Sequence, residues 1–361
     1  MNKKLHLFLL SGWLFAALFP AVAQVRYVDA AELTLIGKAL PTEQRYHRVD
    51  TTVYKGFTRE ENQQLRCSAG LALLFRTNST RIETLPEYAF SSTGSSTPRV
   101  ASEGFDLYIR MPDGEWRYAA SAAPARRGQS CVLVTDMETT EKECLLYLPN
   151  YSELLDLKIG IDETAQIVAS ENPFRHKIVV FGSSFTHGVS TSRAGMSYPM
   201  QIERSSGLYF CNIACSGNCK LQSYFADYLA DCSDADAMLF DAFSNPSAAM
   251  IEERLLPFIE RIRRDLPDVP LIFVQTIWRE RNNFNLQARD FERRKCEMAR
   301  RKMAEAMARF DKVYFIDRDD LTGTDHATSA DGTHPSDLGY WRWAQTLEPE
   351  LLRILDGAGI R

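Results

Sequence analysis

One serine, one aspartate and one histidine in the second half of the chain have the side chains that acyl transfer needs. Ser184 lies in the segment GSSFTHG, directly after a short apolar run, where glycines allow the tight turn that presents a nucleophile. Asp331 and His334 are three residues apart in DGTHP. At that spacing a carboxylate can accept from one imidazole nitrogen and leave the other free to take a proton from a serine. Each segment alone is also compatible with a plain polar loop, but together they predict a Ser-His-Asp triad.

Two further residues could stabilise the oxyanion that forms when such a serine attacks a carbonyl. Gly217 and Asn245 each follow another apolar run. A glycine can offer a bare backbone N–H and an asparagine a side-chain N–H₂, which are the donors that oxyanion holes use. With the N–H of Ser184, these two residues form the predicted oxyanion hole, although each alone is also typical of a turn.

From residue 172 onward, the pattern of apolar residues alternates between strands and helices. This alternation predicts a three-layer α/β/α domain with a parallel sheet, in which chemistry takes place at the carboxyl ends of the strands. The expected strands are 177–181, 208–213, 237–243, 270–276 and 312–316, and the expected helices are 221–229, 247–264, 286–310 and 337–355.

Residues 25–171 favour short strands instead. The apolar run 69–75 and the segments 106–110 and 116–119 are strand-like, and the last two flank a turn signal at 111–114. Residues 91–102 are rich in Ser, Thr and Gly and are expected to form a loop. Many short strands without long amphipathic helices predict a β-sandwich.

The order of these segments resembles the SGNH hydrolase superfamily, also called GDSL-like esterases. Its four sequence blocks are matched in order by Ser184, Gly217, Asn245 and His334, and Asp331 completes the triad. The resemblance covers roughly Lys177 to Leu352. It implies a flavodoxin-like α/β domain, ester hydrolysis by a serine nucleophile, and no metal or cofactor.

The first half resembles the jelly-roll-like β-sandwich domain that precedes the SGNH domain in a group of bacterial exported hydrolases. The segments DAAELTLIGKA (29–39), LFRTNST (74–80) and GFDLYIR (104–110) carry this likeness.

The second half of the chain also departs from the SGNH family pattern. Ser183 stands where the GDS form of block one has an aspartate, the neighbours of Asn245 in block three differ, and Cys215 and Cys219 flank the glycine of block two.

The first 24 residues have the pattern of a removable secretory signal. Lys3 and Lys4 precede a mostly apolar run from Leu5 to Phe19, and the small-residue segment 21–23 is typical of a cleavage site. An N-terminal anchor is the alternative. We expect export to the periplasm or the cell exterior. No later apolar run is long enough for a membrane span, so we expect no transmembrane segment in the mature chain.

The composition of the chain of 361 residues excludes several classes. With 45% hydrophobic and 25% charged residues, it is not a disordered protein. The net charge of −5 gives no electrostatic footprint for nucleic acid. The eight cysteines are too sparse for a disulfide scaffold, and no pairing is predicted. A metal site at Cys211, Cys215 and Cys219 is disfavoured because no histidine lies nearby.

Export and the added sandwich domain resemble enzymes that remove small acyl groups, usually acetyl, from polysaccharides. The expected partner is therefore an acylated poly- or oligosaccharide. Candidate sugar-stacking residues are Trp278, Trp341 and Trp343, and Arg279 and His187 are candidates to line the pocket, with core packing as the alternative for each. Two other functions stay open: a GDSL-type lipase or thioesterase that acts on longer acyl chains, and a non-catalytic glycan-binding protein that keeps the fold.

Overall fold

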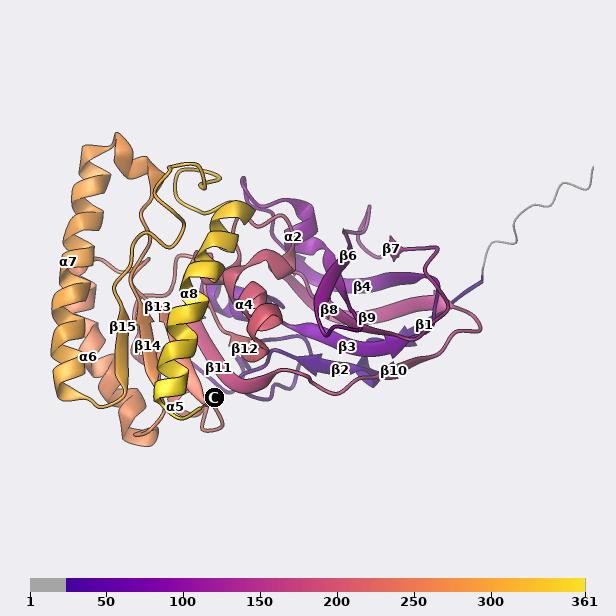
Figure 1. Cartoon of the computed structure of the whole chain (residues 1–361), viewed down its shortest axis with the longest axis horizontal. Coiled ribbons are helices and arrows are strands. Elements are labelled where there is room, and N and C mark those ends of the chain that lie inside the picture. Colours follow the sequence, from indigo (N-terminus) through magenta and orange to yellow (C-terminus); the bar gives the residue numbers. More distant parts are fainter. Residues whose placement is uncertain (1–23, 361) are drawn as a thin grey trace, which may run out of the picture.

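The computed structural model describes residues 24–360, which form three β-sheets (Figure 1). Two antiparallel sheets lie in the first half of the chain and one parallel sheet in the second. The change from antiparallel to parallel pairing falls between Ala169 and Arg175. Residues 1–23 of the predicted secretory signal lie outside the described residues.

The two N-terminal sheets pack face to face. One has the strand order β1 (Val25–Asp29), β9 (Ser152–Asp162), β4 (Ile82–Ser91) and β7 (Cys131–Val134). The other, which we call the inner sheet, has the order β10 (Ile167–Ala169), β3 (Ala72–Thr77), β8 (Lys142–Tyr147), β5 (Phe105–Arg110) and β6 (Trp116–Ala122), and β2 (Thr34–Ile36) also pairs with β3. Buried side chains of both sheets, including Phe75, Leu146 and Ile159, form a common core. This arrangement confirms the predicted β-sandwich.

The inner sheet is buried on both of its faces. Along β3, Leu73 and Phe75 point into the sandwich core, whereas Ala72 and Leu74 pack in a second cluster together with Ile178 of the parallel sheet. Because side chains of a strand alternate between faces, a strand covered on both sides reads as a continuous apolar run. This explains why residues 69–75 lack an alternating pattern.

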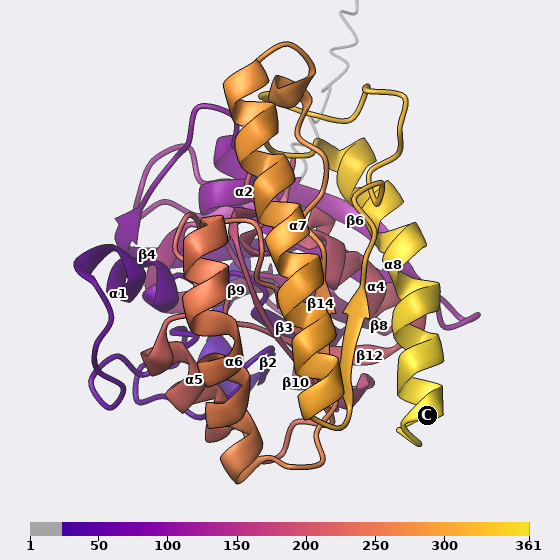
Figure 2. The same cartoon turned by 90° about the vertical axis from the view of Figure 1, so that its left-hand side faces the viewer.

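The parallel sheet has the order β12 (Leu208–Asn212), β11 (Arg175–Gly182), β13 (Ala237–Asp241), β14 (Leu271–Val274) and β15 (Val313–Ile316). Helices α5 (Ser223–Ala230), α6 (Ala248–Asp265) and α7 (Leu286–Arg309) cover one face, and α6 and α7 lie side by side (Figure 2). Helices α4 (Tyr198–Ser206) and α8 (Asp337–Gly357) cover the other face. The predicted three-layer α/β domain is confirmed.

Four short helices were not predicted from the sequence: α1 (Arg59–Arg66), α2 (Arg99–Glu103), α3 (Ser184–His187) and α4. Helix α2 lies partly within 91–102, which was expected to be a loop. Helices of four to nine residues are too short to show a clear period. The ends of α4 do carry signals, since Pro199 stands in its first turn and Gly207 follows its last residue at φ +77°.

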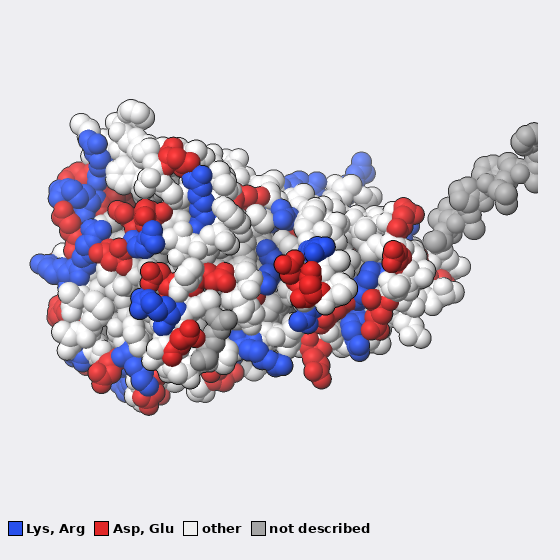
Figure 3. All heavy atoms as spheres, in the orientation of Figure 1, with Lys and Arg blue, Asp and Glu red and all other residues white. Residues whose placement is uncertain are grey.

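Most charged residues of α7 are paired with neighbours of opposite sign. Arg293 lies 2.8 Å from Glu297, Arg300 lies 2.8 Å from Asp317, and Arg301 also pairs with an acid. On the face drawn in Figure 3, Lys and Arg residues alternate with Asp and Glu over both halves of the molecule. This mixture is typical of a solvated surface. Over residues 24–360, no helix has the length and apolar character needed to cross a bilayer.

The two tryptophans of α8 have opposite environments. Trp343 has no exposed surface, and its ring stacks on Tyr198 of α4 at 4.6 Å between centroids. This corrects the expectation that Trp343 could stack on a sugar. Trp341 is half exposed on the outer side of the same helix.

This difference generates a stability prediction. We expect Trp343→Ala to lower the free energy of unfolding by about 3–5 kcal/mol, because a large buried ring leaves a cavity. Trp341→Ala is the matched control and should change it by less than about 0.5 kcal/mol. Urea unfolding followed by circular dichroism measures both, and equal losses would contradict the assigned packing.

Candidate active site

The strand-to-helix turn after β11 presents Ser184. Gly182 ends β11, and a Cβ at this position would lie 2.2 Å from Thr186 Oγ1, so only glycine fits. Ser183 caps α3 by accepting a hydrogen bond from the N–H of Phe185 at 3.2 Å. Ser184 is therefore the first residue of α3, at the carboxyl edge of the sheet, where active sites of such folds lie.

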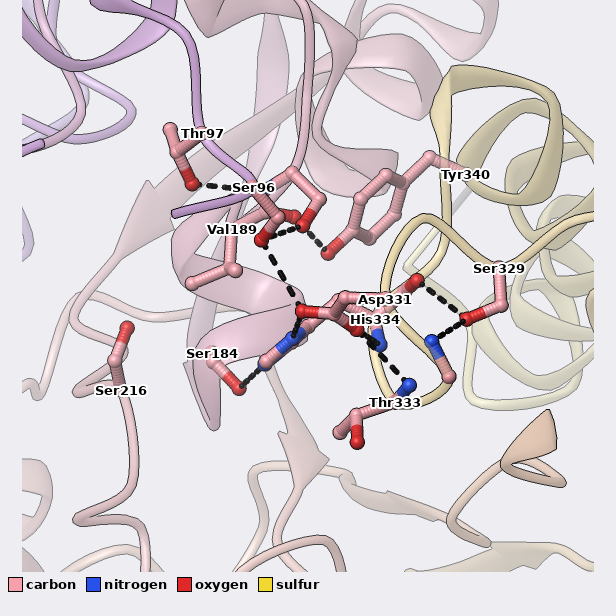
Figure 4. Close-up of polar contacts among 12 residues, drawn as sticks. Ser96, Thr97, Ser184, Val189, Ser216, Ser329, Asp331, Thr333, His334 and Tyr340 are labelled. Atoms are coloured by element: carbon pink, nitrogen blue, oxygen red, sulfur yellow. Dashed lines mark hydrogen bonds and ion pairs between the residues drawn. The ribbon is translucent and has the colours of Figure 1, made fainter. Parts of the chain in front are cut away.

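The structure brings Ser184, His334 and Asp331 into one hydrogen-bonded chain (Figure 4). Ser184 Oγ lies 2.9 Å from His334 Nε2, and His334 Nδ1 lies 2.8 Å from Asp331 Oδ2. With Nδ1 donating to the carboxylate, Nε2 is free to accept the serine proton. This is the geometry of an activated serine nucleophile.

The loop that carries Asp331 and His334 is closed by its own hydrogen bonds. Asp331 Oδ1 accepts from the backbone N–H of Thr333 at 2.9 Å and of His334 at 2.7 Å. Ser329 Oγ accepts from the Gly332 N–H at 2.9 Å and donates to the His334 carbonyl at 3.1 Å. Burial alone would raise the pKa of Asp331, but donation from His334 and Thr333 outweighs it and lowers this pKa to about 2.

A buried carboxylate that sequence reasoning missed lies beneath the nucleophile turn. Asp241, the last residue of β13, accepts from the N–H of Ser183 at 3.0 Å and from its hydroxyl at 2.6 Å. It also accepts from the hydroxyls of Thr186 at 3.0 Å and Ser244 at 2.6 Å. Burial raises the pKa of Asp241. The only sequence signal was its position at the end of an expected strand.

The Asp241 contacts also explain the departure from the GDS pattern. Ser183 donates its hydroxyl proton to Asp241. An aspartate at 183 would bring a second carboxylate against Asp241, and two buried like charges repel. Serine at 183 is therefore compatible with the local chemistry.

The predicted oxyanion donors follow the two strands on either side of β11. Gly217 comes after β12, with φ +71°, and a Cβ there would meet open space. Asn245 comes after β13, and its Oδ1 accepts from the Cys219 N–H at 3.2 Å, which leaves its N–H₂ group as the free donor. The sheet order thus places the ends that carry Gly217 and Asn245 beside the end that carries Ser184.

The N-terminal domain holds the loop that contains Gly217. Gln64 of α1 accepts from the N–H of Ser216 at 2.5 Å and donates to its carbonyl at 3.0 Å. The buried Arg48 donates to the carbonyls of Ala214 at 2.9 Å and Asn212 at 3.2 Å. These contacts fix the backbone on both sides of the loop.

The structure corrects the expectation that His187 lines the pocket. His187 has no exposed surface, and its ring stacks on Tyr151 at 4.2 Å. Its Nε2 donates to the Asn150 carbonyl at 2.9 Å, and its Nδ1 lies 3.2 Å from Ser216 Oγ. Burial lowers the pKa of His187 well below its usual value, so the ring is neutral and joins the two domains.

The other substrate-binding candidates lie around the site rather than in it. Arg279 is buried and donates to Glu292 at 2.9 Å and to the Ser244 carbonyl at 2.6 Å, so it supports the turn before Asn245. Trp278 is half-buried and lines a cavity of about 260 Å³ against α7, and the lining of that cavity does not include the triad.

All eight cysteines lie in the described part of the chain and are unpaired. Residues 24–360 hold no group of three or more His, Cys, Asp or Glu side chains arranged for a metal ion.

Comparison with known proteins shows the family. The model of the GDSL-like lipase/acylhydrolase family matches residues 175–352, and the GxDLY model, described as the N-terminus of SGNH-hydrolase-type esterases, matches residues 25–167. The latter motif reads GFDLY at 104–108. No curated protein matches the chain significantly.

Solved structures with the same architecture include one protein with clear sequence similarity. A protein from Bacteroides ovatus ATCC 8483 described as a GDSL-like lipase is 42% identical, with a TM-score of 0.89, over 92% of this chain and 98% of its own. A salicylyl-acyltransferase from a tetracycline biosynthetic pathway is 18% identical, with a TM-score of 0.69, over 91% of this chain and 97% of its own. A family two carbohydrate esterase from Cellvibrio japonicus is 14% identical, with a TM-score of 0.60, over 92% of this chain and 98% of its own. This chain belongs to the SGNH (GDSL-like) lipase/acylhydrolase family and carries the GxDLY N-terminal domain of that family.

Proposed function

We propose that this protein is a serine esterase that removes small acyl groups, acetyl above all, from carbohydrate. The observation that carries the proposal is the hydrogen-bonded chain from Ser184 Oγ through His334 to Asp331. It supplies a nucleophile, a base that faces it, and a carboxylate that fixes the tautomer of that base.

The reaction follows from this geometry in two half-reactions. Ser184 Oγ attacks the ester carbonyl while His334 Nε2 takes its proton, and His334 then gives the proton to the leaving alcohol. Water attacks the acyl-serine with His334 again as the base, which releases the acid and restores Ser184. Asp331 accepts from Nδ1–H and stabilises the imidazolium in both halves.

The oxyanion of each tetrahedral intermediate is assigned to three donors. They are the backbone N–H groups of Ser184 and Gly217 and the side-chain amide of Asn245. Two of them lie on turns that are fixed before substrate binds, by Asp241 under Ser184 and by Gln64 beside Gly217. Donors that need no reorganisation are the ones that stabilise developing charge best.

The partial exposure of Asp331 and His334, beside a Ser184 that is itself only 8% exposed, supports an acyl group carried by a bulky alcohol. The side chains of Asp331 and His334 are 30% and 20% exposed. A sugar chain can approach such a surface, whereas a long acyl chain needs an apolar tunnel. The likeness to a carbohydrate esterase supports the same substrate class. Secretion, which the pattern of residues 1–24 favours, belongs to this proposal because polysaccharides lie outside the cell.

A lipase is the second candidate, favoured by a specific observation. Phe284 and Leu286 are 94% and 66% exposed at the start of α7. They lie close in sequence to Arg281, whose N–H donates to the Gly332 carbonyl of the catalytic loop at 2.9 Å. The 42% identical protein is also described as a GDSL-like lipase. Exposed apolar side chains on the segment that follows Arg281 are the groups that a longer acyl chain would contact.

The length of the acyl group separates the two candidates. We expect kcat/KM to be higher for 4-nitrophenyl acetate than for the octanoate, and we expect acetate release from at least one acetylated polysaccharide of a panel. Activity that rises with chain length, and falls on Phe284→Ala for octanoate only, would identify a lipase instead.

Replacement of the nucleophile tests the catalytic assignment itself. Ser184→Ala should lower kcat by about 10⁴-fold or more, because no other group can form the acyl-enzyme. Ser233→Ala, an exposed serine away from the site, should keep full activity. If Ser184→Ala hydrolyses esters as fast as the wild type, the nucleophile is wrong. If the wild type hydrolyses none of the esters tested, the esterase proposal fails and the binding-protein alternative gains support.

Replacement of Asp331 tests its role in fixing the tautomer of His334. Asp331→Asn should lower kcat on the order of 10³–10⁴-fold, because an amide favours the wrong imidazole tautomer. Asp325→Asn, an exposed acid of the same loop paired with Arg342, is the matched control and should keep its activity.

The depressed pKa of Asp331 sets the pH window for stability. A carboxyl group with a folded pKa of about 2, against an ordinary value of 3.8, stabilises the fold above about pH 4. That contribution is lost as the pH falls toward 2. The difference in unfolding free energy between the wild type and Asp331→Asn should therefore shrink between about pH 4 and pH 2. Urea titrations at pH 7, 4, 3 and 2 measure this difference. If the difference in unfolding free energy between the two proteins stays constant, the ionised form of Asp331 does not stabilise the fold.

A further inference from the structure

We propose that Ser96, a residue of the N-terminal domain, is a positioning residue of the triad that acts through Asp331. Ser96 Oγ donates to Asp331 Oδ2 at 3.1 Å across a separation of 235 residues in the sequence. Figure 4 shows Ser96 reaching the carboxylate from the N-terminal side while His334 lies on the other side. The inference rests on the serine-esterase mechanism proposed above.

A relay of hydroxyl groups sets the direction of the Ser96 proton. Ser190 Oγ donates to Ser96 Oγ at 2.7 Å. The proton of Ser96 is then the one that faces Asp331, because an ionised carboxylate can only accept. The N–H of Ser190 also donates to Thr97 Oγ1 at 3.0 Å. Ser190 and Thr97 are both buried, which keeps water from competing for these bonds.

The backbone of Ser190 has an unusual conformation at the point where it contacts Ser96 and Thr97. Ser190 has φ +65°, a left-handed conformation that serine rarely adopts. It lies on the loop that follows α3, six residues after the nucleophile, and the Tyr340 hydroxyl holds the preceding Val189 carbonyl at 2.8 Å. Residues 96 and 97 therefore pack against the loop that follows Ser184. From there the Ser96 side chain reaches Asp331.

Ser96 completes the shell of donors around the catalytic carboxylate. Oδ1 of Asp331 accepts from two backbone N–H groups, and Oδ2 accepts from His334 Nδ1. Ser96 is the second donor to Oδ2. The side chain of Asp331 is 30% exposed, so water would take this place in its absence. A fixed donor holds the carboxylate plane toward the imidazole, and such preorganisation lowers the barrier to the chemical step.

The first test is substitution of Ser96. We expect Ser96→Ala to lower kcat on 4-nitrophenyl acetate on the order of tenfold, as for loss of a hydrogen bond to a charged group, with KM unchanged. Ser96→Thr keeps the hydroxyl and should restore kcat. Ser95→Ala removes an exposed neighbouring hydroxyl and should have no effect. Unchanged kcat in Ser96→Ala, or a change confined to KM, would overturn the proposal.

A double-mutant cycle separates positioning of Asp331 from a general structural role. If Ser96 acts through Asp331, Ser96→Ala should cost nothing further in an Asp331→Ala background. An equal loss in both backgrounds would mean that the loop acts elsewhere, and would overturn the proposal. The low-field proton resonance of His334 Nδ1–H gives a readout independent of turnover. It should shift in Ser96→Ala and stay in place in Ser95→Ala.

The outcomes also distinguish this proposal from the proposed function. Activity that persists in Ser184→Ala would defeat the esterase mechanism itself. An active wild type that loses activity in Ser184→Ala but not in Ser96→Ala would defeat only the role of Ser96.

Discussion

The double burial of the inner sheet is the constraint on which the rest of the structure depends. One face of β3, β5 and β8 closes the sandwich, and the other face packs Leu74, Tyr108 and Leu145 into one cluster with the parallel sheet. The two domains therefore share a hydrophobic core and cannot separate without exposing it. The GxDLY motif lies at this junction, where the buried Asp106 accepts from the Gly195 N–H at 2.9 Å and pairs with Arg193 at 3.2 Å.

This fixed junction allows the N-terminal domain to contact the candidate active site at two places. Gln64 sets the loop that carries Gly217, and Ser96 reaches the carboxylate of Asp331. One contact lies beside the predicted oxyanion donor Gly217, and the other lies at the carboxylate of the predicted triad. A domain joined by a flexible linker could not hold both, because each depends on a hydrogen bond whose geometry tolerates little movement.

The sequence was informative where the chemistry is local. Asp331 and His334 share one turn, and Ser184 lies directly after a buried strand, so these segments together predicted a Ser-His-Asp triad. The contacts of Asp241, Ser96 and Gln64 join residues 58, 235 and 152 positions apart, and no local pattern encodes such pairs. His187 shows the opposite error. It was expected to line the pocket, but α3 turns its side chain inward, onto Tyr151.

Two carboxylates lie close to Ser184, and their environments differ. Asp241 is fully buried, its donors are neutral hydroxyl and amide groups, and desolvation raises its pKa. Asp331 is partly solvated, and donation from His334 and Thr333 lowers its pKa to about 2. Groups whose surroundings separate their pKa values in this way take separate roles. In the proposed mechanism, Asp331 keeps the negative charge that stabilises an imidazolium beside it, whereas the desolvated Asp241 holds the turn that presents Ser184.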